Sequence, residues 1–83
     1  MNVRVHVRVI PRLGLLDPQG QAVAHALAAL GFPGVGDVRI GRAIELTVDA
    51  ETPAAAEASV RSMCERLLAN PVTEDFIIAA EPA

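Results

Sequence analysis

The sequence predicts an α+β fold with the element order β-α-β-α-β, and three observations support this. The chain opens with a strictly alternating apolar run, and two helix-length apolar stripes follow, each preceded and ended by cap residues. A second alternating run separates the two helices. We expect a two-layer sandwich whose sheet carries both helices on one face. The 83 residues are expected to form a single domain, residues 1–83.

The first strand is predicted over residues 3–10, which read VRVHVRVI. One face carries only valine, and the other carries Arg4, His6 and Arg8. Such alternation is typical of a strand that is buried on one side only. Pro11 and Gly14 mark the turn that follows.

The first helix is predicted over residues 18–30, with Asp17 as its cap and Pro18 at its first position. Its apolar stripe consists of Val23, Ala26, Leu27 and Leu30. Gly31 suits a left-handed closing position, from which Phe32 could pack back on Leu27.

Gly20 lies in the first turn of this helix, where glycine costs about 1 kcal/mol relative to alanine. We therefore expect another backbone to approach too closely for a side chain. The free amides of this turn could alternatively hold an anion. Asp17 would occupy the same amides and repel that ligand, so a capped helix is favoured.

The second strand is predicted over about residues 37–49, which read DVRIGRAIELTVD. Its apolar residues all fall on even positions, so a two-residue hairpin at Gly41 and Arg42 would turn Glu45 and Thr47 toward the core. A three-residue loop ending at Ala43 keeps the phase but lacks the usual glycine. We favour one strand of about 12 residues, spanning roughly 40 Å.

A strand of that length exceeds what a core this small needs, and 52% of the residues are hydrophobic. Part of the strand is therefore expected to pair with a second copy, so that the long central strand is shared across a homodimer. Arg42 would lie on the apolar face, where a guanidinium needs a partner. Glu45 or Asp37 of a second subunit is the candidate.

The second helix is predicted from a Thr52 cap to about Ala69, and Asn70 is expected in the left-handed closing position before Pro71. Its buried side is predicted from residues that share one helical face: Ala56, Val60, Met63, Cys64, Leu67 and Leu68. The last strand is expected over about residues 72–80, with Phe76 and Ile78 inward.

No catalytic or metal-binding set appears in the sequence. His6 and His25 belong to no spaced ligand set, and the single cysteine, Cys64, fits a small core residue better than a nucleophile. A net charge of -3 and only two aromatic residues give nucleic acid nothing to bind. We expect no membrane span, no signal peptide and a cytoplasmic protein.

Three segments together resemble the PurS family: LLDPQGQAVAHALAALGF, VRIGRAIELTV and MCERLLANPVTEDF. The resemblance implies the small subunit of phosphoribosylformylglycinamidine synthase, a ligase of purine biosynthesis. That enzyme uses formylglycinamide ribonucleotide, glutamine and ATP. In the family, PurL carries the ATP- and magnesium-dependent chemistry and PurQ releases ammonia. PurS carries neither site, forms homodimers and is needed to assemble the other two.

The resemblance therefore implies a non-catalytic chain that binds no cofactor or metal itself and contacts PurL and PurQ. The expected partner or dimer contacts are Asp17, Gln19, Gly20, Arg39, Gly41, Arg42, Glu45, Asn70 and Pro71. In this interpretation, the backbone that approaches Gly20 belongs to PurL, PurQ or the second subunit. The alternative is a stand-alone α+β regulatory domain that binds a small ligand at the start of its first helix.

Overall fold

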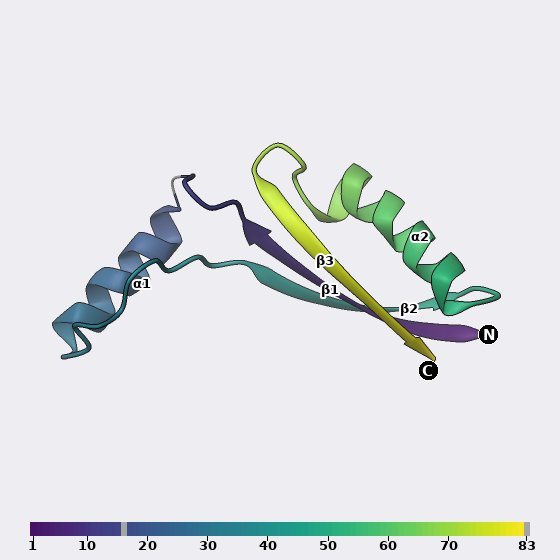
Figure 1. Ribbon diagram of the computed structural model, residues 1–83, viewed down its shortest axis with the longest axis horizontal. Coiled ribbons are helices and arrows are strands. Elements are labelled where there is room, and N and C mark those ends of the chain that lie inside the picture. The colour runs from purple at the N-terminus through teal and green to yellow at the C-terminus, as the bar shows by residue number, and fades with distance from the viewer. Residues whose placement is uncertain (16, 83) are drawn as a thin grey trace.

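The computed structural model describes residues 1–15 and 17–82, so Leu16 and Ala83 lie outside the described residues. The central strand β1 (Asn2–Pro11) pairs antiparallel with β2 (Arg42–Asp49) on one side and with β3 (Glu74–Pro82) on the other. This gives a sheet of order β2-β1-β3 (Figure 1). The predicted α+β class and the element order are confirmed.

The core forms on the valine face of β1, as the alternation predicts. The valines of β1 at positions 3, 5, 7 and 9 are at most 2% exposed. The register places Val7 between Ile44 and Ile78, so that apolar side chains of all three strands share this face. Burying each valine contributes about 1.5–3 kcal/mol. This face is therefore the main source of the fold's stability.

Helix α2 (Pro53–Met63) covers the valine face and begins where the sequence predicts. The Oγ1 atom of Thr52 accepts a hydrogen bond from the Ala55 amide at 3.1 Å. Ala56 and Val60 are fully buried against the sheet. The helix continues as one π-helical segment, η1 (Cys64–Leu68), before the chain turns toward β3.

The π-helical segment changes which residues of the second helix are buried. Cys64 is buried and Leu68 packs against the core, but Leu67 is 83% exposed and Met63 is 38% exposed. The predictions for Leu67 and Met63 are therefore wrong. A π turn holds more residues than an α turn, so Leu67, which lies within it, departs from the 3.6-residue phase. Met63 precedes the π turn and lies at the edge of the buried side.

Helix α1 (Pro18–Ala29) has the predicted ends. Gly31 adopts φ +97°, the Phe32 amide donates to the Leu27 carbonyl at 3.0 Å, and the Gly31 amide donates to the Ala28 carbonyl at 3.2 Å. These two bonds define a Schellman cap. The prediction of a glycine-closed helix is confirmed.

The position of α1 differs from the prediction that both helices lie on one face of the sheet. Figure 1 shows α1 beyond the end of the sheet, with the chain that follows it running back alongside. Gly20 is its one buried residue among those described. The predicted apolar stripe stays largely exposed, with Val23 at 38% and Leu30 at 72%, and only Leu27 is half-buried. The molecule is elongated, with extents of 50 × 25 × 14 Å.

The chain does not reverse at Gly41. Residues 37–41, here named the connecting segment, run on in line with β2 (Figure 1). Both hairpin alternatives are therefore wrong, and the even-numbered residues Val38 and Ile40 are half-buried as the single-strand interpretation requires. Pairing with β1 nevertheless begins at Arg42, so β2 has 8 residues instead of about 12.

Gly41 explains why the ladder begins where it does. A Cβ atom at this position would lie 2.1 Å from the Val9 carbonyl oxygen and 3.0 Å from the Ile10 Cα. The connecting segment thus passes directly against the end of β1, and only a residue without a side chain fits there.

Candidate functional site

The connecting segment joins two separately built parts of the molecule, the arm and the sheet. The arm, defined as residues 18–36, contains α1 and its return loop. Within the described part of the chain, residues 37–41 form no backbone–backbone hydrogen bond outside the strand ladder. An extended segment with unpaired amides can accept another strand. The candidate site is this segment and the polar side chains that hold it.

Asp17 holds the segment to the arm with both oxygens of its carboxylate. Its Oδ1 accepts the Gly20 amide at 3.1 Å and its Oδ2 accepts the Ile40 amide at 2.9 Å. These hydrogen bonds, that of Ile40 most, lower the pKa of the Asp17 carboxyl from its ordinary value of 3.8. The cap prediction is confirmed, and the carboxylate occupies amides that an anion would need.

Gly20 is buried because the connecting segment lies against it. A Cβ atom there would be 2.0 Å from the Val38 carbonyl oxygen and 2.7 Å from an Asp17 carboxylate oxygen. The predicted close approach of a backbone is confirmed. The backbone, however, belongs to this chain and not to PurL, PurQ or a second copy, so that assignment is wrong.

Arg42 holds the other end of the segment to the sheet. Its guanidinium contacts both oxygens of Glu74, at 2.9 and 3.2 Å, and donates to the Leu68 carbonyl at 2.6 Å. The predicted need for a carboxylate is confirmed, but the partner is Glu74 of the same chain and not Glu45 or Asp37 of a second one. The Leu68 carbonyl is free to accept because it ends a helix.

We call each group of polar side chains that ties two segments together a clamp. Asp17 forms the first clamp, and Arg42, Glu74 and Asn70 form the second. The Asn70 amide donates to Glu74 Oε1 at 2.8 Å, and the Asn70 carbonyl accepts the Glu74 amide at 2.8 Å. The hydrogen bond from Arg42, followed by that from Asn70, lowers the pKa of the Glu74 carboxyl from its ordinary value of 4.5. Asn70 does not adopt the predicted left-handed conformation, since no described residue other than glycine has positive φ. Its side chain instead accepts the Val72 amide.

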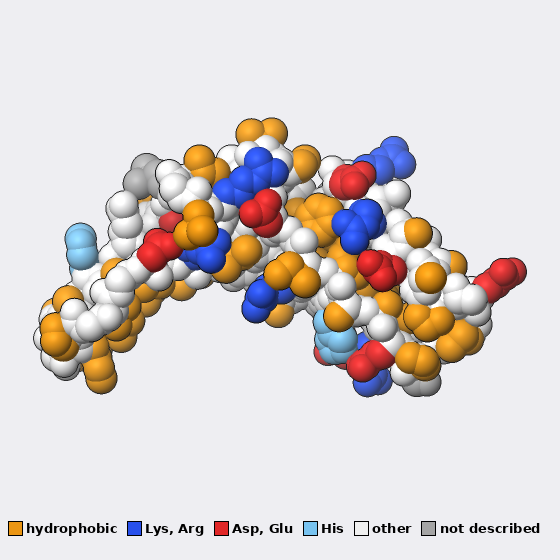
Figure 2. All heavy atoms as spheres, viewed as in Figure 1, with side chains coloured by type: hydrophobic (Ala, Val, Ile, Leu, Met, Phe, Trp, Pro, Cys, Tyr) orange, Lys and Arg blue, Asp and Glu red, His pale blue; other side chains and the backbone are white. Residues whose placement is uncertain are grey.

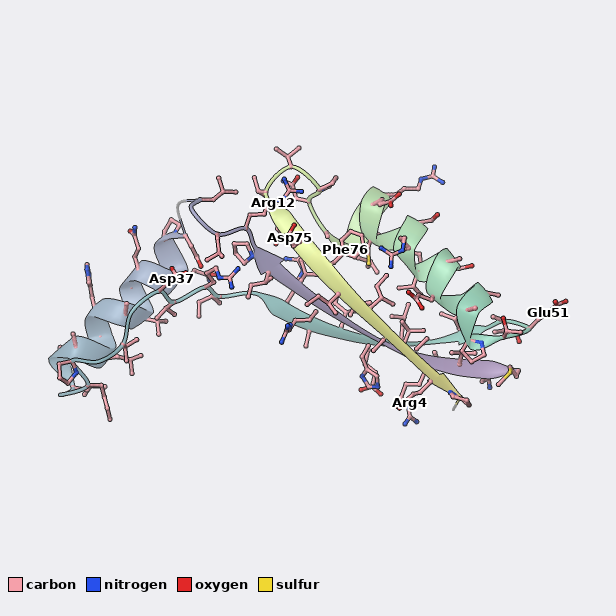
Figure 3. The ribbon with its side chains drawn as sticks, viewed as in Figure 1. Arg4, Arg12, Asp37, Glu51, Asp75 and Phe76 are labelled. Carbon is pink, nitrogen blue, oxygen red and sulfur yellow. The ribbon has the colours of Figure 1, made fainter. Side chains whose placement is uncertain are left out.

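Arg12 forms a third clamp that the sequence analysis did not identify. It donates to Asp75 Oδ1 at 3.0 Å and to the carbonyls of Pro71 and Val72 at 2.7 and 3.2 Å. Figure 3 shows Arg12 beside Asp75 where the loop before α1 meets the start of β3. Nothing in the local sequence pairs these residues, because the contact spans 63 positions.

Three further residues were predicted as contacts: Arg39, Gln19 and Glu45. Only Arg39 lies in the candidate site. Arg39 donates to the Pro11 carbonyl at 3.1 Å and so belongs to the connecting segment with Asp17, Gly20 and Gly41. Gln19 is exposed on the first turn of α1. Glu45 lies on the face of the sheet away from α2, where it contacts Arg4 at 3.4 Å. The predicted residues therefore form two clusters and two isolated positions. The clusters are Asp17, Gly20, Arg39 and Gly41, and Arg42, Asn70 and Pro71; the isolated residues are Gln19 and Glu45.

Three features of the described residues bear on function: the grouping of metal-ligating side chains, the length of the helices and the reactivity of the thiol. Among the described residues, no three His, Cys, Asp or Glu side chains are placed to hold a metal ion, and no helix is long and apolar enough to cross a membrane. Burial raises the pKa of the Cys64 thiol, which disfavours the reactive thiolate. His6 and His25 are exposed.

The fold is that of a small α+β protein whose connecting segment is held between a helix and a sheet by polar side chains. The chain belongs to the PurS family: the family model described as phosphoribosylformylglycinamidine (FGAM) synthase matches residues 4–82.

Curated relatives and solved structures agree with this assignment. Subunit PurS of Bacillus subtilis is 45% identical over 73 residues, covering 88% of this chain and 86% of the relative. That of Mycobacterium leprae is 44% identical, covering 94% and 95%. The crystal structure of the Bacillus subtilis PurS has a TM-score of 0.85 at 42% identity, covering 96% of this chain and 99% of the other. A chain of PurLQS from Thermotoga maritima has a TM-score of 0.87 at 30% identity, covering 98% and 99%.

Replacing Gly20 with alanine tests the contact between α1 and the connecting segment. Alanine should gain about 1 kcal/mol in a helix, but here its Cβ would clash with the Val38 carbonyl, so Gly20→Ala should lower the melting temperature. Gly34→Ala is the matched control because nothing lies within 4 Å of its Cβ position. A Gly20→Ala variant at least as stable as the parent would contradict the contact.

Glu74 predicts an acid-dependent loss of stability. Its pKa is lower in the folded chain, so its contribution is complete above its ordinary value of 4.5 and is lost as the pH falls through the folded value. Glu74→Gln should be less stable at pH 7 and show a shallower loss below pH 4.5 in urea unfolding. The exposed Glu51→Gln should keep the parent slope. Equal slopes for the parent and Glu74→Gln would exclude the clamp as an acid-sensitive element.

Proposed function

We propose that this chain is the non-catalytic assembly subunit of phosphoribosylformylglycinamidine synthase, bridging PurL and PurQ. The observation that carries this proposal is the match to a chain of PurLQS from Thermotoga maritima over 98% of the sequence. The polar side chains of the candidate site support it, because they hold distant segments of the chain together.

The complete synthase would convert formylglycinamide ribonucleotide, ATP and glutamine to formylglycinamidine ribonucleotide, ADP, phosphate and glutamate. In this proposal PurL binds ATP and magnesium, PurQ releases ammonia, and this chain helps ammonia to pass by holding the two together. The chain itself would bind no cofactor. Its single cysteine is free, which fits the reducing cytoplasm where we place the complex.

We infer a homodimer joined through the connecting segment. The Ile40 amide points to Asp17, and amides alternate in direction along an extended chain. The amides of Arg39 and Gly41 therefore point to the opposite edge, where a second copy could pair antiparallel. This pairing would complete the long shared strand that the sequence predicts.

The arm supplies apolar surface for the same contact. Its exposed large apolar residues are Val23, Leu30, Phe32 and Val35, at 38, 72, 56 and 42%. Figure 2 shows apolar side chains in a run along one edge of the arm. Such a run on a thin, elongated molecule favours burial against another chain.

The residues proposed to make or support contacts with a second copy, PurL or PurQ remain those expected from the sequence. Arg39 and Gly41 would contribute backbone amides to the dimer, while Asp17, Gly20 and Arg42 would hold the segment in position for it. Gln19, Glu45, Asn70 and Pro71 are proposed as surface contacts.

The assembly role predicts a specific pattern of synthase activity. PurL and PurQ from the same source should show glutamine-dependent formation of formylglycinamidine ribonucleotide only when this chain is added. PurL supplied with ammonium chloride should be active without it, because the chemistry does not need this chain. Glutamine-dependent activity that is unchanged by omitting the chain would overturn the proposal.

The dimer is tested by removing one backbone donor. Arg39→Pro lacks the amide that would pair with the second copy, whereas Arg39→Ala keeps that amide and loses the side-chain contacts to Pro11 and Asp37. We expect Arg39→Pro to sediment as a monomer and Arg39→Ala to remain a dimer, with circular dichroism confirming that both are folded. A dimeric Arg39→Pro would place the interface elsewhere.

A further inference from the structure

A small hollow lies where the connecting segment passes the end of β1. Its volume is about 270 Å³, and it is lined by Arg8, Arg39 and Arg42, by Gly41 and by apolar residues of β1 and β2. No acidic residue of the described chain lines it. We name it the arginine hollow. Its volume lies just below the roughly 300–1,000 Å³ of typical ligand pockets, so it suits a small ligand.

Two of these arginines have hydrogen-bond donors to spare. Among the described residues, no carboxylate oxygen lies within 4.0 Å of the Arg8 guanidinium. Arg39 donates from Nη1 to the Pro11 carbonyl at 3.1 Å, but its Nε is 3.9 Å from Asp37 Oδ2, which is too far for a hydrogen bond. Because a guanidinium carries five N–H groups, Arg8 and Arg39 can each bind a further acceptor.

The third arginine and the nearby carboxylates leave this charge largely unmatched. The Arg42 guanidinium is already paired with both oxygens of Glu74, and the Asp17 carboxylate accepts two backbone amides. Asp37 is 69% exposed at the arm end of the connecting segment (Figure 3), where water screens its charge. The arginine hollow therefore keeps an excess of positive charge from the other two arginines.

We propose that the arginine hollow binds the phosphate group of a small molecule between Arg8 and Arg39. Arg8 belongs to β1 and Arg39 to the connecting segment, so two guanidinium forks reach the ligand from different segments. A carboxylate has two oxygens in one plane and fills one fork, whereas a phosphate group presents three oxygens around a tetrahedral centre and a higher charge. The pair of arginines thus favours phosphate over carboxylate. The site is separate from the first turn of α1, where Asp17 occupies the Gly20 amide.

A second hollow provides room for the rest of the ligand. It has a volume of about 530 Å³ and adjoins the first, because Arg8 and Ala43 line both. Its lining includes the small Ala79 and Ile77, which is 53% exposed. The apolar part of a phosphate ester held at Arg8 would lie there. Inorganic phosphate would fill the arginine hollow alone.

Isothermal titration of the isolated full chain at low ionic strength tests the proposal with three probes: inorganic phosphate, the phosphate monoester AMP, and acetate. Phosphate and AMP should both bind, and acetate should bind at least ~10-fold more weakly, because it fills one guanidinium fork only. Added salt should weaken the binding. A smaller Kd for AMP than for phosphate assigns the site to phosphate esters, and equal values assign it to free phosphate.

Removing either arginine should weaken binding. Arg8→Ala and Arg39→Ala should each raise the Kd for AMP by at least ~10-fold, because each loses a charge-assisted hydrogen bond. Arg4→Ala is the matched control, since Arg4 carries the same charge on β1 but lines neither hollow. Its Kd should change by less than ~2-fold. Circular dichroism should show that all three variants are folded.

Several results would overturn the proposal. These are no binding of phosphate or AMP at ~10 mM, acetate bound as tightly as phosphate, and either arginine variant binding AMP as the parent does. A loss in Arg4→Ala as large as in the other two variants would also overturn it, because the effect would then be one of net charge. The titration needs neither PurL nor PurQ, whereas the glutamine-dependent assay needs both. Failure of one proposal is therefore distinguishable from failure of the other.

Discussion

The contact between the first turn of α1 and the carbonyl of Val38 is the constraint on which the rest of the molecule depends. Gly20 provides the space, and the Asp17 carboxylate bonds to amides on both sides of the contact. Because α1 is held against the connecting segment, it cannot lie on its own sheet. The elongated shape follows from this contact, and so does the lack of backbone–backbone hydrogen bonds in the described residues 37–41, where the Ile40 amide donates to Asp17.

The polar clamps join segments that lie far apart in the sequence. Arg42 and Glu74 bind the beginning of β2 to the beginning of β3, and Arg12 binds the turn before α1 to the loop before β3. Each uses a guanidinium with several directed donors, which fixes geometry better than a single charge would. A preordered segment loses less conformational entropy when a partner binds it, so these clamps suit a protein that functions by association.

The two faces of the sheet differ in burial: the valine face is covered by α2, and the other face is exposed. The valine face and α2 supply the buried core, and this leaves the other face free to carry charge. In a chain of 83 residues, apolar surface left outside the core is a large share of the total. The arm and the connecting segment are the two places at which other chains would cover that surface.

Much of this protein could be predicted from its sequence because the relevant signals are local. Alternation specified β1, cap residues specified both ends of α1 and the start of α2, and the even phase of residues 38–48 excluded a hairpin. The last strand was expected over about residues 72–80 and lies at Glu74–Pro82. The π turn at Cys64–Leu68 could not be predicted this way, because the pattern assumes a constant helical period. The partners of Arg12 and Arg42 were also missed, because these contacts join positions 63 and 32 residues apart.

The sequence alone also determined that Gly20 and Arg42 needed close partners, since a glycine in a helix and a guanidinium on an apolar face are each unfavourable without compensation. Only the tertiary structure decided that both partners lie in the same chain, because whether a distant segment or another molecule fills a gap depends on how the elements are placed in space. The same placement left α1 off the sheet, which no local pattern records.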